Sequence, residues 1–222
     1  LFHLGTLRWF RRGPAISKIE EVRQELLQLG VKDVKVAPVG LDFSVMKSDF
    51  AAYDRAALRR EFGLLPEDMV ICTVGRMGPE KNPLDLVEIY QQVREQKPCK
   101  LLLVGEGTQS EDLKTKIAAS KWKSDIVLID RIPNDQIWKV YATADYFVNL
   151  CRTEIFGMAI LEAMYYGVSV AALAAPGPSV TLRDMPGHKL CSSYEEIRDW
   201  LLAEHPAPVS YTHLRAHETS QD

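Results

Sequence analysis

Short apolar runs alternate with longer amphipathic stretches along most of the chain. The runs are rich in Val, Ile and Leu at consecutive positions, which is typical of strands buried on both faces of a parallel sheet. The predicted strands are Val34–Val39, Met69–Val74, Lys100–Val104, Ile126–Ile129, Tyr146–Leu150 and Ser169–Leu173. The predicted helices are Ser17–Leu29, Pro83–Gln96, Glu111–Ser120, Asp135–Thr143 and Met158–Tyr166.

This alternation predicts an α/β fold, a doubly wound, Rossmann-like parallel sheet with helices on both faces. Ligands of such folds bind beyond the carboxyl ends of the strands, so the loops there are the first places to search for chemistry. We expect Asn82 to cap a helix that begins at Pro83. Gly105 and Gly107 permit a sharp turn, and Gly167 is expected to end a helix in a left-handed conformation.

Both ends of the chain depart from this pattern. Residues 1–33 contain one helical pattern and no complete α/β unit, and we interpret them as the remnant of a preceding domain and its linker. Residues 34–206 are the predicted main domain. Residues 207–222 show no apolar period and resemble translated adapter sequence, so we interpret them as a non-native tail. His213 and His217 lie four residues apart there, but without a third ligand nearby they predict no metal site.

Composition excludes several classes of function. The net charge is −3, from 27 basic and 30 acidic residues, so nothing favours nucleic acid as a partner, and any bound anion needs a local site. Four scattered cysteines suit a reducing compartment and argue against a disulfide framework. No signal peptide is visible, and no apolar run approaches the ~20 residues that span a bilayer. We therefore expect a cytoplasmic protein.

The strongest chemical signal is the run Glu154-Ile-Phe-Gly-Met-Ala-Ile-Leu-Glu162, which leads from a buried strand into a helix. The start of a helix offers free N–H groups and the positive end of its dipole, which suits phosphate oxygens. Gly157 lets a ligand approach the backbone. Each glutamate can accept two hydroxyl hydrogen bonds from a sugar or a ribose. The alternative is that Glu162 is a solvated helix residue and Glu154 a loop charge.

Two other strand-end loops carry candidate residues. Gly75-Arg76-Met77-Gly78-Pro79-Glu80-Lys81-Asn82 places two cations where they can converge on a diphosphate, although a pair of surface charges is the alternative. Val104-Gly105-Glu106-Gly107-Thr108 resembles a dinucleotide fingerprint but has Ser110 in place of the third glycine. We interpret this second loop as a turn whose backbone approaches the nucleotide.

Taken together, these segments resemble the family 4 (group 1) glycosyltransferases of GT-B architecture, in particular their C-terminal nucleotide-sugar-binding domain. The resemblance runs from about Val34 to Ala203. The motifs that carry it are Gly75-Arg76, Glu80-Lys81-Asn82, Leu102–Gly107, Tyr141 with Ala144-Asp145, and the paired glutamates Glu154 and Glu162 around Phe156-Gly157.

The resemblance implies roles for single positions. Arg76 and Lys81 are similar to the pair that neutralises the leaving diphosphate, and Glu154 to the glutamate that contacts the donor sugar, so these three are the catalytic candidates. Glu162 is similar to the residue that holds the ribose hydroxyls. The other implied donor contacts are Gly75, Gly105, Glu106, the Arg131 and Ile132 loop along the base, and the backbone of Phe156, Gly157, Met158 and Ala159.

The implied reaction transfers a hexosyl group from a UDP- or GDP-linked sugar to an acceptor hydroxyl, with retention of configuration, in glycan, polysaccharide or glycolipid synthesis. It uses no cofactor, and no Asp-x-Asp metal motif occurs. A sugar or lipid-linked acceptor would be held by the missing N-terminal domain, and the full enzyme would associate peripherally with a membrane if the acceptor is lipid-linked. Asp130 replaces a common glycine before the base loop, and the run 171–178 also departs from the family pattern.

Three alternatives stay open from the sequence. An epimerase or phosphorylase of the same architecture would bind a similar ligand without transfer to an acceptor hydroxyl. A nicotinamide-dependent dehydrogenase is disfavoured by the broken glycine fingerprint. A non-catalytic nucleotide-binding module is disfavoured because both cations and both glutamates are present.

Overall fold

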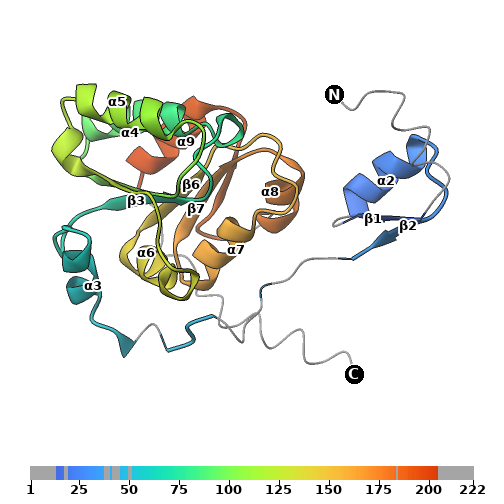
Figure 1. Ribbon diagram of the computed structural model, residues 1–222, viewed down its shortest axis with the longest axis horizontal. Helices are drawn as coiled ribbons and strands as arrows, with labels where there is room; N and C mark the ends of the chain where they lie inside the picture. Colours follow the sequence, from blue (N-terminus) through green and yellow to red (C-terminus); the bar gives the residue numbers. More distant parts are fainter. Residues whose placement is uncertain are drawn as a thin grey trace.

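The computed structural model describes residues 14–17, 20–37, 41, 46–49, 52–183 and 185–204. Its central feature is a six-stranded sheet with the order β5-β4-β3-β6-β7-β8 (Figure 1). Every neighbouring pair in this sheet is parallel. The strands are β3 (Val70–Val74), β4 (Lys100–Val104), β5 (Ile126–Ile129), β6 (Tyr146–Asn149), β7 (Ser169–Leu173) and β8 (Lys189–Cys191).

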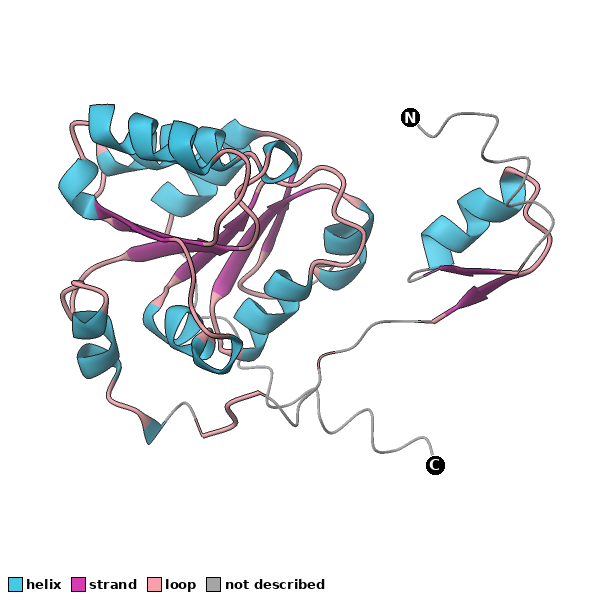
Figure 2. Cartoon of the chain, in the orientation of Figure 1, coloured by secondary structure: helices cyan, strands magenta, loops and turns pink. Residues whose placement is uncertain are grey.

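Helices cover both faces of this sheet (Figure 2), which confirms the doubly wound fold. One face packs against α3 (Arg55–Glu61), α6 (Trp138–Thr143) and α7 (Met158–Tyr165). The other face packs against α4 (Pro83–Arg94), α5 (Ser110–Ala119) and α9 (Tyr194–Leu202). Successive strand residues alternate between the two cores, because side chains of a strand point to opposite faces in turn. The shorter helical segments are α8 (Pro176–Thr181), η2 (Pro79–Lys81), η3 (Lys123–Asp125) and η4 (Asn134–Gln136).

The strand order places a topological switch point in the middle of the sheet. From β3 the chain adds β4 and β5 on one side, and then returns to add β6, β7 and β8 on the other. The connections on the two sides of the β3–β6 pair therefore run in opposite directions, which opens a crevice at the carboxyl ends of those two strands.

The strand predicted at Val34–Val39 does not join this sheet. Its described part, β2 (Val34–Val36), pairs in parallel with β1 (Ala15–Ser17) in a separate two-stranded sheet. The helix α2 (Glu20–Gln28) connects these two strands, so residues 15–36 form the βαβ unit that the sequence analysis did not recognise. The three-residue strand β1 is too short to give a periodic signal.

Other differences are local. The helix predicted over Asp135–Thr143 is divided into η4 and α6, and α3, α8 and β8 were not predicted. Asn82 does not cap α4 with its side chain: it lies in the left-handed region with φ 50° and donates its amide to the Leu150 carbonyl at 2.9 Å. Pro83 does open α4, and Gly167 has the expected positive φ of 74°.

An ion-pair cluster around the buried Arg59 fixes the amino-terminal edge of the sheet. The Asp145 carboxylate, just before β6, accepts from Arg55 at 2.7 Å, from Arg59 at 2.9 Å and from the Val70 backbone N–H at 2.7 Å. Arg59 is 3% exposed and also donates to the carbonyls of Thr143 and Pro66. This cluster ties α3 to the starts of β3 and β6, so α3 is anchored by charge as well as by apolar packing.

The four cysteines are all buried and free. Among the described helices, none combines the length and the apolar character needed to cross a bilayer.

Candidate functional site

The loops that follow β3 and β4 are joined through their backbones. The Gly75 N–H donates to the Val104 carbonyl at 3.0 Å, and the Met77 N–H donates to the Glu106 carbonyl at 3.1 Å. Gly105 has φ 137°, and a Cβ there would lie 1.8 Å from the Gly75 oxygen. The predicted turn is therefore confirmed, and glycine is required at this position by the close approach of two backbones as well as by φ.

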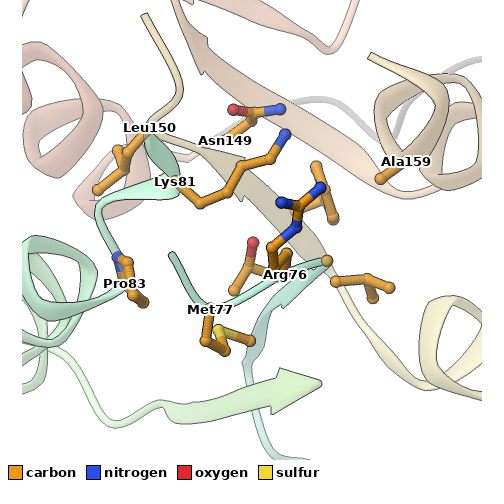
Figure 3. A pocket seen from close by; sticks show the side chains of 11 residues that line it. Arg76, Met77, Lys81, Pro83, Asn149, Leu150 and Ala159 are labelled. Carbon is orange, nitrogen blue, oxygen red and sulfur yellow. The ribbon is translucent and has the colours of Figure 1, made fainter. Parts of the chain in front are cut away.

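A pocket lies at the carboxyl ends of β3 and β6, at the switch point (Figure 3). The free space between its lining side chains, open solvent included, is about 370 Å³. Arg76 and Lys81 from the β3 loop both enter it, with their charged ends on the same side (Figure 3). The lining residues are Thr73, Val74, Gly75, Arg76, Met77, Lys81, Pro83, Phe147, Asn149, Leu150 and Ala159.

Lys81 and Glu154 form the closest ion pair of this pocket. The Lys81 Nζ lies 2.5 Å from Glu154 Oε2, and Glu154 Oε1 accepts the Gly157 N–H at 3.1 Å. Burial alone would raise the pKa of Glu154, but Lys81, Asn149 and the Gly157 N–H together hold that pKa below its ordinary value. Glu154 is thus a carboxylate that already anchors the lysine and the start of a helix.

The start of α7 faces the same region. Gly157 precedes the helix with φ 76°, and the N–H groups of Met158 and Ala159 belong to the first turn, which has no partners within the helix. Ala159 also lines the pocket. The helix α8 packs directly against the loop that precedes this turn. A Cβ added at Gly177 of α8 would lie 2.7 Å from the Phe156 backbone nitrogen. The geometry presents N–H donors and a helix dipole beside two cations, an arrangement suited to an anion.

Arg76 is the more accessible of the two cations. Its side chain is 76% exposed, and its Nε lies 4.0 Å from Glu80 Oε1, at the limit of an ion pair. An exposed pair of this kind contributes little, so a ligand can take the guanidinium at little cost. The planar guanidinium can then bind two oxygens of one phosphate.

Glu162 lies about one turn further along α7 than the pocket residue Ala159 and has a different partner. Its Oε2 accepts from the Tyr141 hydroxyl at 2.6 Å. Burial raises the pKa of Glu162, and the hydrogen bond from Tyr141 offsets only part of that rise. Burial together with the charge of Glu162 also raises the pKa of Tyr141, so the tyrosine remains a donor. The alternative of a fully solvated Glu162 is therefore wrong.

The predicted base loop lies at the end of β5. Arg131 is exposed, whereas Ile132 packs against the core on the α6 side of the sheet. Asp130, which replaces the common glycine, lies 3.5 Å from Lys114 of α5. Glu106, Gly107 and Asp130 line a shallow open hollow in front of α5. The structure brings Gly105 and Glu106 to the β3 loop, but Arg131 lies outside the lining of the central pocket.

Sequence reasoning missed several contributors to the pocket. Asn149 ends β6 at 7% exposure, and its Oδ1 accepts the Cys151 N–H at 2.8 Å. Its Nδ2 lies 3.5 Å from Glu154 Oε2. A polar residue that closes an otherwise apolar strand was the available signal, because such a position faces the ligand edge of the sheet. Thr73 of β3, which also lines the pocket, offered a weaker signal, because threonine is common in strands.

Metal ligands do not gather in the described part of the chain: no three His, Cys, Asp or Glu side chains come together there as a site. The prediction that the reaction needs no metal stays a prediction, as does every role assigned to a single residue.

Comparison with known proteins decides the family. The sequence profile of the family described as glycosyl transferases group 1 matches residues 54–195. The chain belongs to this family. The match covers β3 to β8 and every candidate site residue from Gly75 to Glu162, so the family resemblance drawn from the sequence motifs is confirmed.

Curated members of the family support the assignment. The chain is 31% identical over 170 residues to the D-inositol 3-phosphate glycosyltransferase of Segniliparus rotundus, a match covering 74% of this chain and 37% of that protein. It is 26% identical over 131 residues to the alpha-monoglucosyldiacylglycerol synthase of Acholeplasma laidlawii, covering 58% of this chain and 33% of that protein. The chain therefore spans well under half the length of these group 1 enzymes.

Solved structures confirm the GT-B fold. Anabaena Alr3699/HepE, in complex with UDP and glucose, aligns with a TM-score of 0.74 at 20% identity over 90% of this chain and 57% of that chain. The C-terminal domain of the group 1 protein LpcC from Francisella tularensis aligns with a TM-score of 0.61 at 23% identity, over 73% of this chain and 86% of that domain. The predicted fold, the C-terminal half of a GT-B glycosyltransferase, is thus confirmed.

Proposed function

We propose that this chain binds a nucleoside diphosphate sugar and that the whole enzyme transfers its hexosyl group to an acceptor hydroxyl with retention of configuration. The observation that carries the proposal is the meeting of Arg76, Lys81 and the first turn of α7 at the switch point of the sheet. A diphosphate leaving group gains negative charge in the transition state, and fixed cations and N–H groups stabilise that charge without rearranging.

The Lys81–Glu154 pair suits this task. An ammonium group has three N–H donors, so Lys81 can keep its bond to Glu154 while it donates to a phosphate oxygen. Glu154, held by the pocket residue Lys81 and by the Gly157 N–H, is the residue proposed to contact the donor sugar. In this proposal the diphosphate enters between Arg76 and the start of α7.

The relatives guide the choice of donor and acceptor. Alr3699/HepE was crystallised with UDP and glucose, and we propose UDP as the first nucleotide to test, with GDP as the other. Other similar proteins are named as a glycosyltransferase of D-inositol 3-phosphate and a synthase of a glucosylated diacylglycerol. These names support a sugar-like or lipid-linked acceptor and a role in glycan, polysaccharide or glycolipid synthesis. From the sequence alone we propose a cytoplasmic site of action, peripheral to a membrane in the lipid-linked case.

We also propose a domain boundary. Because β2 pairs with β1 outside the main sheet, we assign residues 1–37 to the N-terminal acceptor domain and its linker, and place the donor domain after them. The relatives carry transferase and synthase names, which disfavours the epimerase and phosphorylase alternative. Membership of the family also disfavours the dehydrogenase.

The decisive experiment compares nucleoside and nucleoside diphosphate. By titration calorimetry, Arg76→Ala and Lys81→Ala should each weaken UDP binding about tenfold or more, because a hydrogen bond to a charged group is worth ~1.5–3 kcal/mol. Uridine binding should change little. Lys121→Ala is the matched control, since Lys121 is 62% exposed and pairs with Glu95, the residue that follows α4, outside the pocket lining. Equal losses of affinity for uridine and for UDP in these two variants would contradict the proposal.

A further inference from the structure

Tyr141 is a buried side chain directed at a candidate ligand-binding carboxylate. It lies in α6, is 0% exposed, and donates to Glu162 Oε2 at 2.6 Å. Glu162 lies in α7 and is only partly buried, and its carboxylate is held by the buried tyrosine hydroxyl. Family likeness gave Tyr141 no role, and apolar packing does not explain a charge-assisted bond at this position.

The tyrosine ring is itself fixed. It stacks on Tyr166 with ring centroids 5.7 Å apart and planes at 10°, and lies 6.1 Å from the Phe147 ring at 51°. The Tyr166 hydroxyl in turn accepts the Lys47 N–H at 3.1 Å. A ring packed in this way has no freedom to swing its hydroxyl aside, so the donor stands at a fixed point under the carboxylate.

We propose that Tyr141 is a positioning residue for the donor: its buried hydroxyl holds the Glu162 carboxylate in the orientation that accepts the ribose hydroxyls. The inference rests on the proposed function, because it takes Glu162 as the ribose ligand. A carboxylate oxygen with one lone pair engaged by Tyr141 presents its remaining lone pairs outward, and two of these suffice for a diol.

Electrostatics supports this role. Burial raises the pKa of Glu162, and the bond from Tyr141 lowers it again in part. Without the tyrosine donor the carboxyl would keep its proton to a higher pH, and a protonated carboxyl accepts fewer hydroxyl bonds. The other titratable groups close to the pair are the Cys72 thiol of β3 and the Tyr166 hydroxyl. Both stay neutral at ordinary pH, because burial raises the pKa of Cys72 above its usual range and that of Tyr166 to about 12.

The test uses the 222-residue chain and four variants. Tyr141→Phe keeps the ring and removes the hydroxyl. Tyr90→Phe is the matched control, because Tyr90 is also 0% exposed and its hydroxyl bonds to the Cys99 carbonyl at 3.2 Å, in the core on the α4 side of the sheet. Glu162→Gln and the double variant with Tyr141→Phe complete the set. Affinities for UDP and 2′-deoxy-UDP are measured by calorimetry between pH 5 and 8, with melting temperatures alongside.

We expect Tyr141→Phe to lower the preference for UDP over 2′-deoxy-UDP about fivefold to tenfold, and to move the acid limb of UDP binding to higher pH. Tyr90→Phe should lower the melting temperature comparably and leave the preference unchanged. Adding Tyr141→Phe to Glu162→Gln should cause no further loss of preference, because the tyrosine acts through the glutamate; a merely structural role would give additive losses.

An unchanged preference in folded Tyr141→Phe, or additive losses in the double variant, would overturn the inference alone. A wild-type chain that binds no UDP would overturn the proposed function instead, and the inference with it. If Tyr141→Phe does not fold, tyrosine Cζ carbon NMR of the wild-type chain decides. One resonance should shift both in Glu162→Gln and on addition of UDP, and the absence of any such resonance would overturn the inference.

Discussion

At the scale of single residues, the surroundings of Glu154 and Glu162 shift the pKa values of their carboxyl groups in opposite directions. Glu154 has a lysine and a helix N–H as donors, which outweigh burial and keep its pKa low. Glu162 has one neutral donor, Tyr141, and burial keeps its pKa high. Sequence spacing identified both glutamates. It did not predict their side-chain partners, because Lys81 lies 73 positions from Glu154 and Tyr141 lies 21 positions from Glu162.

The two glutamates should therefore affect stability with opposite dependence on pH. A lowered pKa in the folded state means that Glu154 stabilises the fold above the ordinary glutamate pKa and loses this contribution as pH falls. A raised pKa means that Glu162 stabilises the fold most at low pH and loses this contribution as pH rises through its folded pKa. Melting curves of ligand-free protein from pH 4 to 7 should show the difference from wild type growing with pH for Glu154→Gln. As pH rises over the same range, the melting temperature of the wild type should fall relative to that of Glu162→Gln. Parallel curves for the two variants would contradict this assignment.

At the scale of elements, the crossing of the β3 and β4 loops should tolerate no side chain at Gly105. An added Cβ meets a backbone oxygen at 1.8 Å and the residue has φ 137°, so neither a rotamer change nor a small shift relieves the contact. Gly105→Ala should destabilise the chain by more than about 3 kcal/mol, beyond the ~1–3 kcal/mol of backbone strain alone.

Gly63→Ala provides the control for that change. Gly63 also has a positive φ, of 70°, but an added Cβ there meets nothing within 4 Å. Gly63→Ala should therefore lower the free energy of unfolding, measured by chemical denaturation, by only ~1–2 kcal/mol, the strain of a left-handed residue. Equal losses for the two variants would show that strain alone, and not the crossing of the backbones, sets the need for glycine.

The elements that the sequence predicted are those with long or continuous patterns. The strands of the main sheet from β3 to β7 are mostly apolar, and their predicted positions differ from the observed ones by at most one residue at each end. The strand β8 has three residues and the helix α3 has seven, two of them arginines bonded to Asp145. Such short elements depend on tertiary contacts for their stability, so the local sequence pattern does not predict them.

At the scale of the whole molecule, binding and transfer should separate. The four side chains proposed to hold the donor all lie between β3 and α7, so the 222-residue chain should bind UDP measurably by calorimetry. Transfer requires an acceptor fixed against the donor, and such positioning is worth ~7–11 kcal/mol of barrier. We expect no transfer of glucose from UDP-glucose to any acceptor.

Removal of residues 207–222, which lie outside the described residues together with His213 and His217, provides the control and should leave UDP binding unchanged. Robust transferase turnover by this chain would contradict the separation of binding from transfer. A loss of UDP binding after the truncation would contradict the interpretation of these residues as a non-native tail.

The position of the Asp145 cluster has a consequence for engineering. Asp145, Arg55 and Arg59 tie the strands together at the edge opposite to the pocket, and none of the proposed ligand contacts belongs to this cluster. Loops grafted from other family members onto the pocket edge would leave these bonds intact. Chimeras that exchange residues 130–134, the loop proposed to lie along the base, would therefore test base preference on an unchanged framework.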